Sequence, residues 1–250
     1  MSISDSDDPR PLYAQVRDQL IERIRSGVWK PGQLIPNEFD IAAEFGVSQG
    51  TARKAIEALA SERLVLRRQG RGTFVVEHTP AHVLFRFFNI MDHAGAPITP
   101  DSTKVSALVA QSTDEEQRRL SLAAGDEVIR ISRVRTREGK PFIAEIIALP
   151  AKLFPGLIDL PVIPNTLYDL FQRSYGILMM RTDDRLTAVS ADADAAAKLG
   201  VAPGTPLLRI DRTAFGLDER PIEWRTSLCH LENAHYIART KLSHGGDGGR

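Results

Sequence analysis

The pattern of hydrophobic positions in the first 76 residues predicts three short helices followed by a β-hairpin. Apolar residues at steps of three and four predict a first helix over residues 12–24, which Gly27 ends. A second helix is capped by Asn37 and closed by Gly46. Ser48 caps the third helix, whose inward face is predicted to consist of Ala52, Ala55, Ile56 and Leu59.

The opposite side of the third helix is polar near its N-terminus, where Gln49, Gly50, Arg53 and Lys54 face solvent. Beyond this helix, Leu64 and Leu66 are predicted to share one side of a strand, and Gly70-Arg71-Gly72 then permits a tight hairpin tip that carries a cation. A helix that presents donors to the major groove, followed by a basic hairpin for the minor groove, is a winged helix-turn-helix. The alternative is a small helical domain that binds no DNA. The order and spacing of the elements favour the winged helix.

Residues along this block also match a known pattern. They are Pro11-Leu12-Tyr13 and Gln15-Val16 at the start, Pro31-Gly32 and Ile35-Pro36 before the second helix, Gly46-Val47-Ser48, Thr51, Arg53, Ala55-Ile56 and Leu59 around the third helix, and Arg68 with residues 70–75 in the hairpin. With them the block resembles the N-terminal domain of the GntR family of bacterial transcription regulators. The resemblance implies that Gly70 approaches the minor groove and that Ser48 and Thr51 bind phosphate.

The chain departs from the family pattern at two positions. Family arginines that commonly read guanine fall here at Phe39 and Gln49. Since arginine reads guanine bidentately and glutamine favours adenine, the family's operator sequence does not transfer. Arg53 matches a third contact position. The DNA-binding residues predicted in this way are Ser48, Gln49, Gly50, Thr51, Arg53, Lys54, Arg68, Gly70 and Arg71.

The pattern changes after the break at Thr79-Pro80. Strand-like runs cover residues 83–90, 104–110, 128–137, 142–149, 186–190, 207–214 and 222–228, with hairpin turns at 138–140 and 216–219. Short helices are predicted over residues 114–122, 166–174 and 192–199, the first with a capping box formed by Thr113 and Glu116. Strands joined by hairpins, with helices around them, predict an α+β domain built on an antiparallel sheet.

Several stretches of this region carry a second resemblance. They are residues 131–145, 153–157, 166–170, 195–209 and 220–223. They resemble the effector-sensing UTRA domain of the HutC subfamily of GntR regulators, whose fold is shared with chorismate lyase. The predicted organisation is a disordered tail over residues 1–9, a winged helix-turn-helix over 10–77, a linker over 78–84, the UTRA domain over 85–241 and a disordered tail over 242–250.

One strand of the second region concentrates positive charge. Arg133 and Arg135 are two residues apart, so both point to the same face. Like charges repel there unless a carboxylate or a bound anion lies between them, and Glu145 on the partner strand is one candidate. The alternative is a solvated face with a cross-strand salt bridge. The resemblance implies effector binding at the matching positions, which are Arg133, Arg135, Glu145, Thr166, Tyr168 and Glu223.

The chemistry of the effector is predicted from an aromatic segment. Arg86 stands where sugar-phosphate sensors of the family have a small hydroxyl residue, and Phe87 and Phe88 follow it. A cation beside aromatic rings suits a planar carboxylate better than a sugar phosphate. The expected partner is therefore a small anionic metabolite, for which a carboxylate is favoured. Alternatively, the two phenylalanines fill the cavity and the domain senses little.

Composition narrows the class of protein only slightly. The chain carries 32 basic and 32 acidic side chains, but residues 10–76 hold 11 Lys and Arg against 7 Asp and Glu, an excess that suits DNA. No apolar run is long enough to span a membrane and no secretory signal is present, so a cytoplasmic protein is expected. Cys229 is the only cysteine, which excludes an internal disulfide. His78 and His82 have Pro80 between them, and neither a metal site nor a cofactor is predicted.

Two function classes remain at this point. The first is a homodimeric repressor or dual regulator whose operator binding is tuned by a small anionic metabolite. Its operator in double-stranded DNA is expected to be pseudo-palindromic, because one winged helix covers too few base pairs for specificity. The second is an enzyme with a chorismate-lyase-like pocket. The fused winged helix disfavours the enzyme, and so does the lack of a nucleophile and base set. Cys229 and His230 are neighbours in a predicted strand and face opposite sides.

Overall fold

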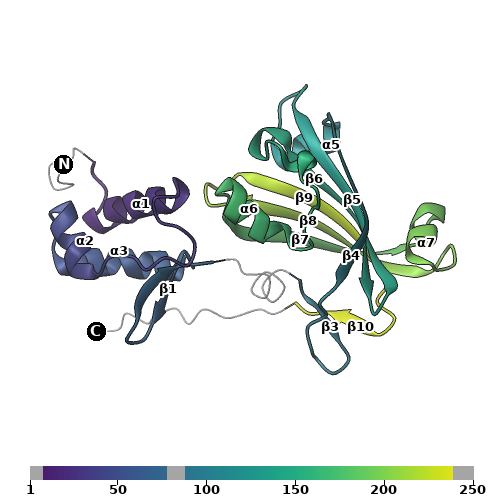
Figure 1. Cartoon of the computed structure of the whole chain (residues 1–250), viewed down its shortest axis with the longest axis horizontal. Helices are drawn as coiled ribbons and strands as arrows, with labels where there is room; N and C mark the ends of the chain where they lie inside the picture. Colours follow the sequence, from purple (N-terminus) through teal and green to yellow (C-terminus); the bar gives the residue numbers. More distant parts are fainter. Residues whose placement is uncertain (1–7, 78–87, 239–250) are drawn as a thin grey trace.

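The computed structural model describes residues 8–77 and 88–238, and Figure 1 shows two groups of elements that follow one another along the chain. The first group contains α1 (Leu12–Arg25), α2 (Glu38–Phe45), α3 (Gln49–Ser61), β1 (Val65–Arg68) and β2 (Gly72–Val75). The second contains β3 (Ile90–Asp92), β4 (Asp101–Gln111), α5 (Asp114–Leu120), β5 (Glu127–Arg137), β6 (Lys140–Pro150), η2 (Ala151–Leu153), η3 (Leu157–Asp159), α6 (Leu167–Tyr175), β7 (Met179–Ser190), α7 (Ala193–Leu199), β8 (Pro206–Gly216), β9 (Pro221–Cys229) and β10 (Ala234–Tyr236). The predicted α+β class is confirmed.

The first group is a winged helix-turn-helix, as the hydrophobic pattern predicts. The predicted faces of α1 and α3 are buried against each other, and burial of each large apolar side chain contributes about 1.5–3 kcal/mol. The predicted caps are also present. The Asn37 side chain accepts hydrogen bonds from the backbone of Phe39 and Asp40, and Ser48 Oγ accepts one from Thr51 N at 3.2 Å.

Two apolar residues of the first group are more exposed than the pattern indicates. Leu66 is 50% exposed, although it was expected to share a side with Leu64. The inward face of β1 begins at Val65, which pairs with Val75, so Leu66 falls on the outer face. Phe39, an apolar residue of the predicted second helix, is 67% exposed. Phe39 therefore lies on the surface beside the N-terminus of α2.

The second group is built on a six-stranded antiparallel sheet in the order β4-β5-β6-β9-β8-β7. Side chains of β6 alternate between its two faces, which we call inner and outer. The inner face is covered by α6 and the 3-10 turns η2 and η3, whose Phe154, Leu157 and Phe171 pack against Ile131 and Ile147. These contacts form the main apolar core of this domain.

The outer face of the sheet is covered only at its ends. Near one end lies α5, whose Thr113–Glu116 capping box is present as predicted. Near the other end lies α7, which packs its alanines on β6. Between these helices Ile146 is 52% exposed and lines a groove of about 320 Å³ with Trp224 and Thr226. The middle of the outer face is thus an open, partly apolar surface.

The strand predictions fail where alternation is weak. β7 begins at Met179 rather than at residue 186, because its first half carries charged residues at the edge of the sheet. β4 begins at Asp101 rather than at residue 104. A strand was expected over residues 83–90. Residues 83–87 lie outside the described part of the chain, and β3 begins only at Ile90, where it pairs with β10, which was not expected.

The predicted domain boundaries stay predictions. The linker over residues 78–84 and the C-terminal tail over 242–250 lie outside the described residues, as do most of the N-terminal tail residues. Among the described residues, no helix combines the length and the apolar character needed to cross a membrane.

Candidate DNA-binding surface and effector pocket

The N-terminal half of α3 presents most of the predicted DNA-binding residues. Gly50 is exposed in the first turn, and Gln49 and Thr51 are partly exposed. Ser48 Oγ lies 2.9 Å from Thr51 Oγ1, so two hydroxyl groups stand together beside the backbone N–H groups that begin the helix. Because a helix N-terminus attracts anions, this arrangement can hold a DNA phosphate.

Arg53 is brought into an ion pair that the sequence does not reveal. Its Nε donates to Glu38 Oε2 at 3.0 Å, and Arg67 Nη2 donates to Glu38 Oε1 at 3.0 Å. Glu38 belongs to α2 and Arg67 to β1, so one carboxylate joins the helix-turn-helix to the wing. Neither residue was predicted, since separations of 15 and 29 residues along the chain leave no local pattern.

Lys54 is exposed, but its side chain lies toward α1 and not along the DNA-facing side of α3. Its Nζ lies 4.2 Å from the centre of the Tyr13 ring, a cation–π contact that orients the side chain. The prediction that Lys54 contacts DNA beside Arg53 therefore has less support than the prediction for Arg53 itself.

The hairpin between β1 and β2 has the geometry of a wing. Gly70 and Gly72 have φ values of +69° and +104°, which favour glycine, and Arg71 N donates to Arg68 O at 2.9 Å. A Cβ at Gly72 would also come within 2.6 Å of a Leu34 methyl carbon. Arg71 is exposed at the tip, while the Arg68 guanidinium lies 4.8 Å from the centre of the Phe74 ring. The tip thus presents the Arg71 guanidinium between two glycines that carry no side chains.

The inner face of the sheet holds a buried group of charges, which we call the arginine cluster: Arg133, Arg135, Glu145, Glu223 and Arg225. Arg133 Nε donates to Glu145 Oε2 at 2.6 Å across the pair of strands β5 and β6. Arg135 approaches the same carboxylate at 3.8 Å. The cross-strand salt bridge, which the alternative interpretation also included, is therefore present. The solvated face of that alternative is wrong, since Arg133 is only 2% exposed.

Strand β9 and helix α6 complete the arginine cluster. Arg225 contacts both carboxylates, at 3.5 Å from Glu145 and 2.8 Å from Glu223. Tyr168 of α6 donates its hydroxyl to Glu223 Oε1 at 2.8 Å, and Ser227 donates to Glu145 at 3.2 Å. The sequence analysis missed Arg225, although its spacing of two from Glu223 along a strand was a usable signal.

Burial and charge shift the pKa values of this cluster in opposite directions. Burial alone raises the pKa of Glu145, but Arg133, Arg225 and Arg135 outweigh it and hold the pKa well below its usual range. Burial and the charge of Glu223 raise the pKa of Tyr168, so its hydroxyl stays protonated and donates. Burial lowers the pKa of Arg135 to about 9, because Glu145 compensates it only in part.

The arginine cluster contains three cations and two carboxylates. Arg135 Nε and Arg225 Nε are buried and have no hydrogen-bond partner among the described residues. A neighbouring pair, Arg212 with Asp184 at 2.6 Å, is balanced in charge. The cluster thus has a surplus positive charge and unsatisfied donors in an apolar interior, where each such group is costly.

Asn165, and not the predicted effector residue Thr166 beside it, contacts the arginine cluster directly. Its backbone oxygen accepts from Arg133 at 3.1 Å, and its side-chain oxygen accepts from Arg135 Nη2 at 2.8 Å. Thr166 precedes α6 without a side-chain cap bond and is half-buried. Asn165 was missed because a residue before a helix carries no periodic signal. Arg86 and Phe87 lie outside the described residues.

The space beside the arginine cluster is small. A cavity of about 20 Å³ lies between Glu145, Arg225, Phe88 and Tyr236, enough for about one water molecule. Phe88 covers Arg135, with the guanidinium 5.1 Å from the ring centre. Glu223 and Tyr168 are already in contact through the hydrogen bond at 2.8 Å. The space in this structure is therefore too small for a metabolite.

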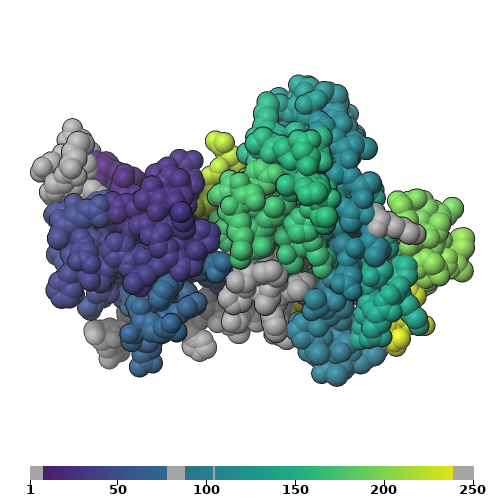
Figure 2. All heavy atoms as spheres, in the orientation of Figure 1, coloured from purple at the N-terminus to yellow at the C-terminus, as the bar shows by residue number. Residues whose placement is uncertain are grey.

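The two domains meet beside α6, where Figure 2 shows the first domain against the second. Leu178, which precedes β7, is buried in the core of the first domain. Gln172 Nε2 donates to Val76 O at 3.0 Å, and Arg173 pairs with Glu77 at 3.2 Å. α6 is thus bonded to the chain just after the wing.

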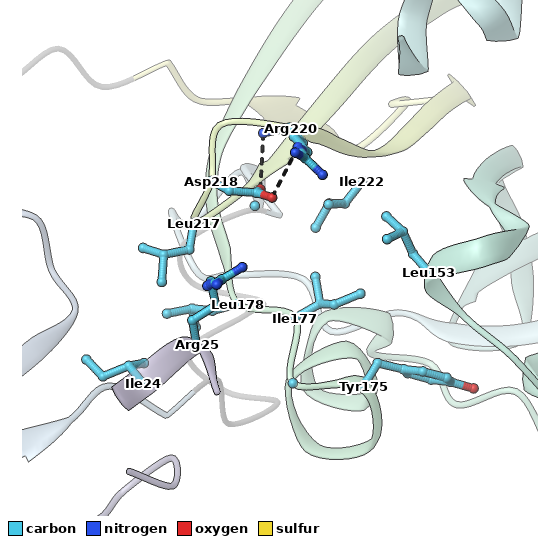
Figure 3. A pocket seen from close by; sticks show the side chains of 12 residues that line it. Ile24, Arg25, Leu153, Tyr175, Ile177, Leu178, Leu217, Asp218, Arg220 and Ile222 are labelled. Carbon is cyan, nitrogen blue, oxygen red and sulfur yellow. Dashed lines mark hydrogen bonds and ion pairs between the residues drawn. The ribbon is translucent and has the colours of Figure 1, made fainter. Parts of the chain in front are cut away.

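This junction is loosely packed on both sides of Leu178. One cavity of about 230 Å³ lies between α1 and the second domain, where Figure 3 shows Ile24 and Arg25 across from Leu153 and Ile222. A second cavity of about 490 Å³ also borders Leu178. Domains packed in this way can change their relative arrangement with little loss of contact.

A winged helix that presents arginines at its recognition helix and its tip, joined to a domain built on an antiparallel sheet, is the architecture of a two-domain DNA-binding regulator. Comparisons with known proteins establish the family. Residues 12–75 match the model of the bacterial regulatory proteins of the gntR family, and residues 97–235 match the UTRA domain. The chain belongs to the GntR family, in its HutC-like branch with a UTRA domain.

Similar proteins and similar solved structures support the same family assignment. The chain is 27% identical to a probable fructoselysine utilization operon transcriptional repressor of Escherichia coli, over 92% of this chain and 94% of the relative. It is 30% identical to the transcriptional repressor NagR of Bacillus subtilis, over 83% and 85%. The ligand-binding domain of a GntR-family regulator from Bordetella bronchiseptica matches with a TM-score of 0.58 and 30% identity, over 62% of this chain and 98% of that domain.

The protein is therefore a transcriptional regulator and not an enzyme. The site agrees with the family. Cys229 is buried, and burial raises the pKa of its thiol, which disfavours the reactive thiolate. Among the described residues, no group of three or more His, Cys, Asp or Glu side chains gathers in a way that could hold a metal ion.

We expect Arg53→Ala and Arg71→Ala each to lower affinity for a selected operator by about tenfold or more, because each removes a guanidinium aimed at a groove. Gel-shift titration measures the loss. Arg118→Ala is the control, since Arg118 is an exposed arginine of the second domain that pairs with Glu115. Near-wild-type affinity in both test variants would contradict the docking of this winged helix.

Proposed function

We propose that the protein is a homodimeric repressor whose affinity for its operator changes when a small anionic metabolite binds at the arginine cluster. The repressor role is supported by the relatives named above as repressors. A protein that acts on bacterial chromosomal DNA works in the cytoplasm, which is the location we infer. The operator is double-stranded DNA with two related half-sites.

The observation that carries the anion proposal is the surplus charge of the arginine cluster. Two buried guanidinium Nε–H groups have no partner among the described residues, and three arginines share two carboxylates. A carboxylate or phosphate bound there supplies both the missing charge and the missing acceptors. We infer that the metabolite contacts Arg135 and Arg225 first, because these two carry the unsatisfied donors.

A carboxylate is the favoured class of anion. Phe88 stacks over Arg135, so the entrance to the cluster is flat and partly aromatic. Arg86, which the sequence places next to this entrance, is proposed as a further contact. Thr166, Tyr168 and Glu223 remain proposed as effector-binding residues.

Entry of a metabolite is proposed on the side of β3 and β10. Phe88, Asn89 and Tyr236 close the small cavity on that side, and Asn89 donates to the Tyr236 hydroxyl at 3.1 Å. These residues follow directly on the segment that leads from the wing. An anion that enters on this side therefore displaces Phe88, the first described residue after the segment that connects the two domains.

Helix α6 offers a second connection between the pocket and the DNA-binding domain. Tyr168 and Gln172 are four residues apart on one face of α6. Tyr168 contacts Glu223 of the arginine cluster, and Gln172 contacts Val76 at the end of the wing. A change at Glu223 thus moves the helix that holds the first domain. Only a difference in affinity between the two arrangements produces control.

The homodimer is proposed to form through the outer face of the sheet. Ile146 is 52% exposed at the centre of that face and borders the groove with Trp224 and Thr226. A two-fold axis through such a patch buries the same residues on both copies. Two winged helices then lie on one assembly and can contact two half-sites.

Arg135→Met should remove the response to anions without unfolding the protein. Arg135 stays 3.8 Å from Glu145 and its Nε has no hydrogen-bond partner among the described residues, so the free energy of unfolding should change by less than about 1 kcal/mol. Arg133→Met is the matched comparison. It removes the partner at 2.6 Å from Glu145 and should destabilise by about 3–5 kcal/mol. Chemical denaturation measures both, and thermal shift with a panel of carboxylates and phosphates measures the response. Equal stabilisation of wild type and Arg135→Met by one compound would place the pocket elsewhere.

Gln172→Met should uncouple the two domains, because it removes the hydrogen bond to Val76 while keeping the length of the side chain. Operator binding without metabolite and the thermal shift with it should stay close to wild type. The change in operator affinity on adding the metabolite should shrink by about tenfold. Ser174→Ala, at an exposed position of the same helix, is the control. If the metabolite changes the operator affinity of Gln172→Met as much as that of the wild type, α6 does not transmit the response.

Ile146→Glu should convert the dimer to a monomer, since it places a charge in the centre of the proposed interface. Light scattering at micromolar concentration measures the mass. Val162→Glu is the matched control, because Val162 is 75% exposed in a loop outside that face. A monomer mass for the wild-type protein would contradict the proposed dimer. A dimer mass for Ile146→Glu would show that the interface lies on another surface.

A further inference from the structure

Glu38 is an acidic residue on the surface that must approach a polyanion. It is the first residue of α2, and its side chain is 22% exposed. Repulsion from phosphates makes a carboxylate unfavourable there unless neighbouring groups offset its charge. Its two oxygens are taken up by Arg53 on one side and Arg67 on the other, each at 3.0 Å. Each Glu38 oxygen therefore already accepts a hydrogen bond from an arginine of this surface.

The geometry of these contacts leaves the reading end of Arg53 available. Glu38 binds Nε of the guanidinium, so the two terminal nitrogens stay together on the opposite edge. Arg53 remains 56% exposed in this position. The terminal edge is a planar fork that matches O6 and N7 of guanine. Because Glu38 holds Nε, the Arg53 side chain is already restricted to few rotamers before it meets DNA. Less conformational entropy is therefore lost on binding.

Arg67 is held in the same way from the wing side. It donates one terminal nitrogen to Glu38 and is 46% exposed. Glu38 thus sets the distance between an arginine of the recognition helix and an arginine of the wing. The next residue, Phe39, is 67% exposed beside this pair.

We propose that Glu38 is a positioning residue for operator specificity, which holds Arg53 and Arg67 away from phosphates and toward base edges. This inference rests on the proposed DNA-binding function of the same surface. The carboxylate lowers affinity for DNA of any sequence, because it neutralises part of two cations. It raises the preference for the operator, because the two arginines are ordered before they meet the DNA.

The test compares Glu38→Gln with wild type on two duplexes, an operator fragment selected from randomised DNA by the wild-type protein and a random-sequence duplex of equal length. The variant should bind the random duplex several-fold more tightly and the operator less tightly. The ratio of the two affinities should fall by about tenfold, the discrimination of roughly one bidentate contact. Loss of a negative charge should also steepen the dependence of random-duplex binding on salt.

Glu44→Gln is the matched control. Glu44 lies on the same helix and also pairs with an arginine, Arg23 of α1, away from Arg53 and Arg67. It should leave the affinity ratio unchanged. Thermal unfolding of each variant shows whether the fold is intact. The variant Arg53→Lys provides a second, independent test of the proposal. Lysine keeps the charge without the fork, so adding Glu38→Gln to Arg53→Lys should lower the ratio less than Glu38→Gln lowers it in the wild-type protein, where both arginines depend on Glu38.

The outcomes separate the two proposals. Equal losses of operator and random-duplex affinity in Glu38→Gln, with the ratio unchanged, would show a merely structural role and overturn the inference. Additive effects of Glu38→Gln and Arg53→Lys would overturn it as well. If wild-type protein selects no operator at all, the DNA-binding function itself fails, and not only the role of Glu38.

Discussion

The burial of charge on the inner face of the UTRA sheet is the constraint on which the second domain depends. Taking a guanidinium out of water is costly, and only a carboxylate at close range with further hydrogen bonds offsets it. Glu145 lies opposite Arg133 and within reach of two more arginines, so one residue of β6 keeps three cations in an apolar interior. Strands β5, β6 and β9 are held in register by charge as well as by backbone hydrogen bonds.

The same constraint explains why this part of the core is suited to regulation. A core of leucine and isoleucine alone has no reason to respond to an anion. A cluster that is incompletely neutralised has one, because an added anion relieves a cost that the protein already bears. The helix that covers the cluster is bonded to the end of the wing, and the cavities beside Leu178 leave the junction room to rearrange.

Sequence reasoning succeeded where the determining contacts are local. The caps at Asn37 and Ser48 and the facing of Arg133 with Glu145 follow from spacing along one helix or one hairpin. It failed where a contact joins distant segments. The bridge from Glu38 to Arg67 and the contact of Asn165 with Arg135 depend on tertiary packing, which no periodicity records. Strands as short as β3 and β10 contain too few residues to alternate.

The pockets that border Leu178 have a consequence for the mechanics of the molecule. Both are open to solvent, so water can fill or leave them when the two domains shift relative to each other. The two domain cores, by contrast, are closely packed around residues such as Leu20 and Phe171. A shift at the junction therefore disturbs less packing than a shift within either core, so that the relative position of the domains is the softest coordinate of this protein.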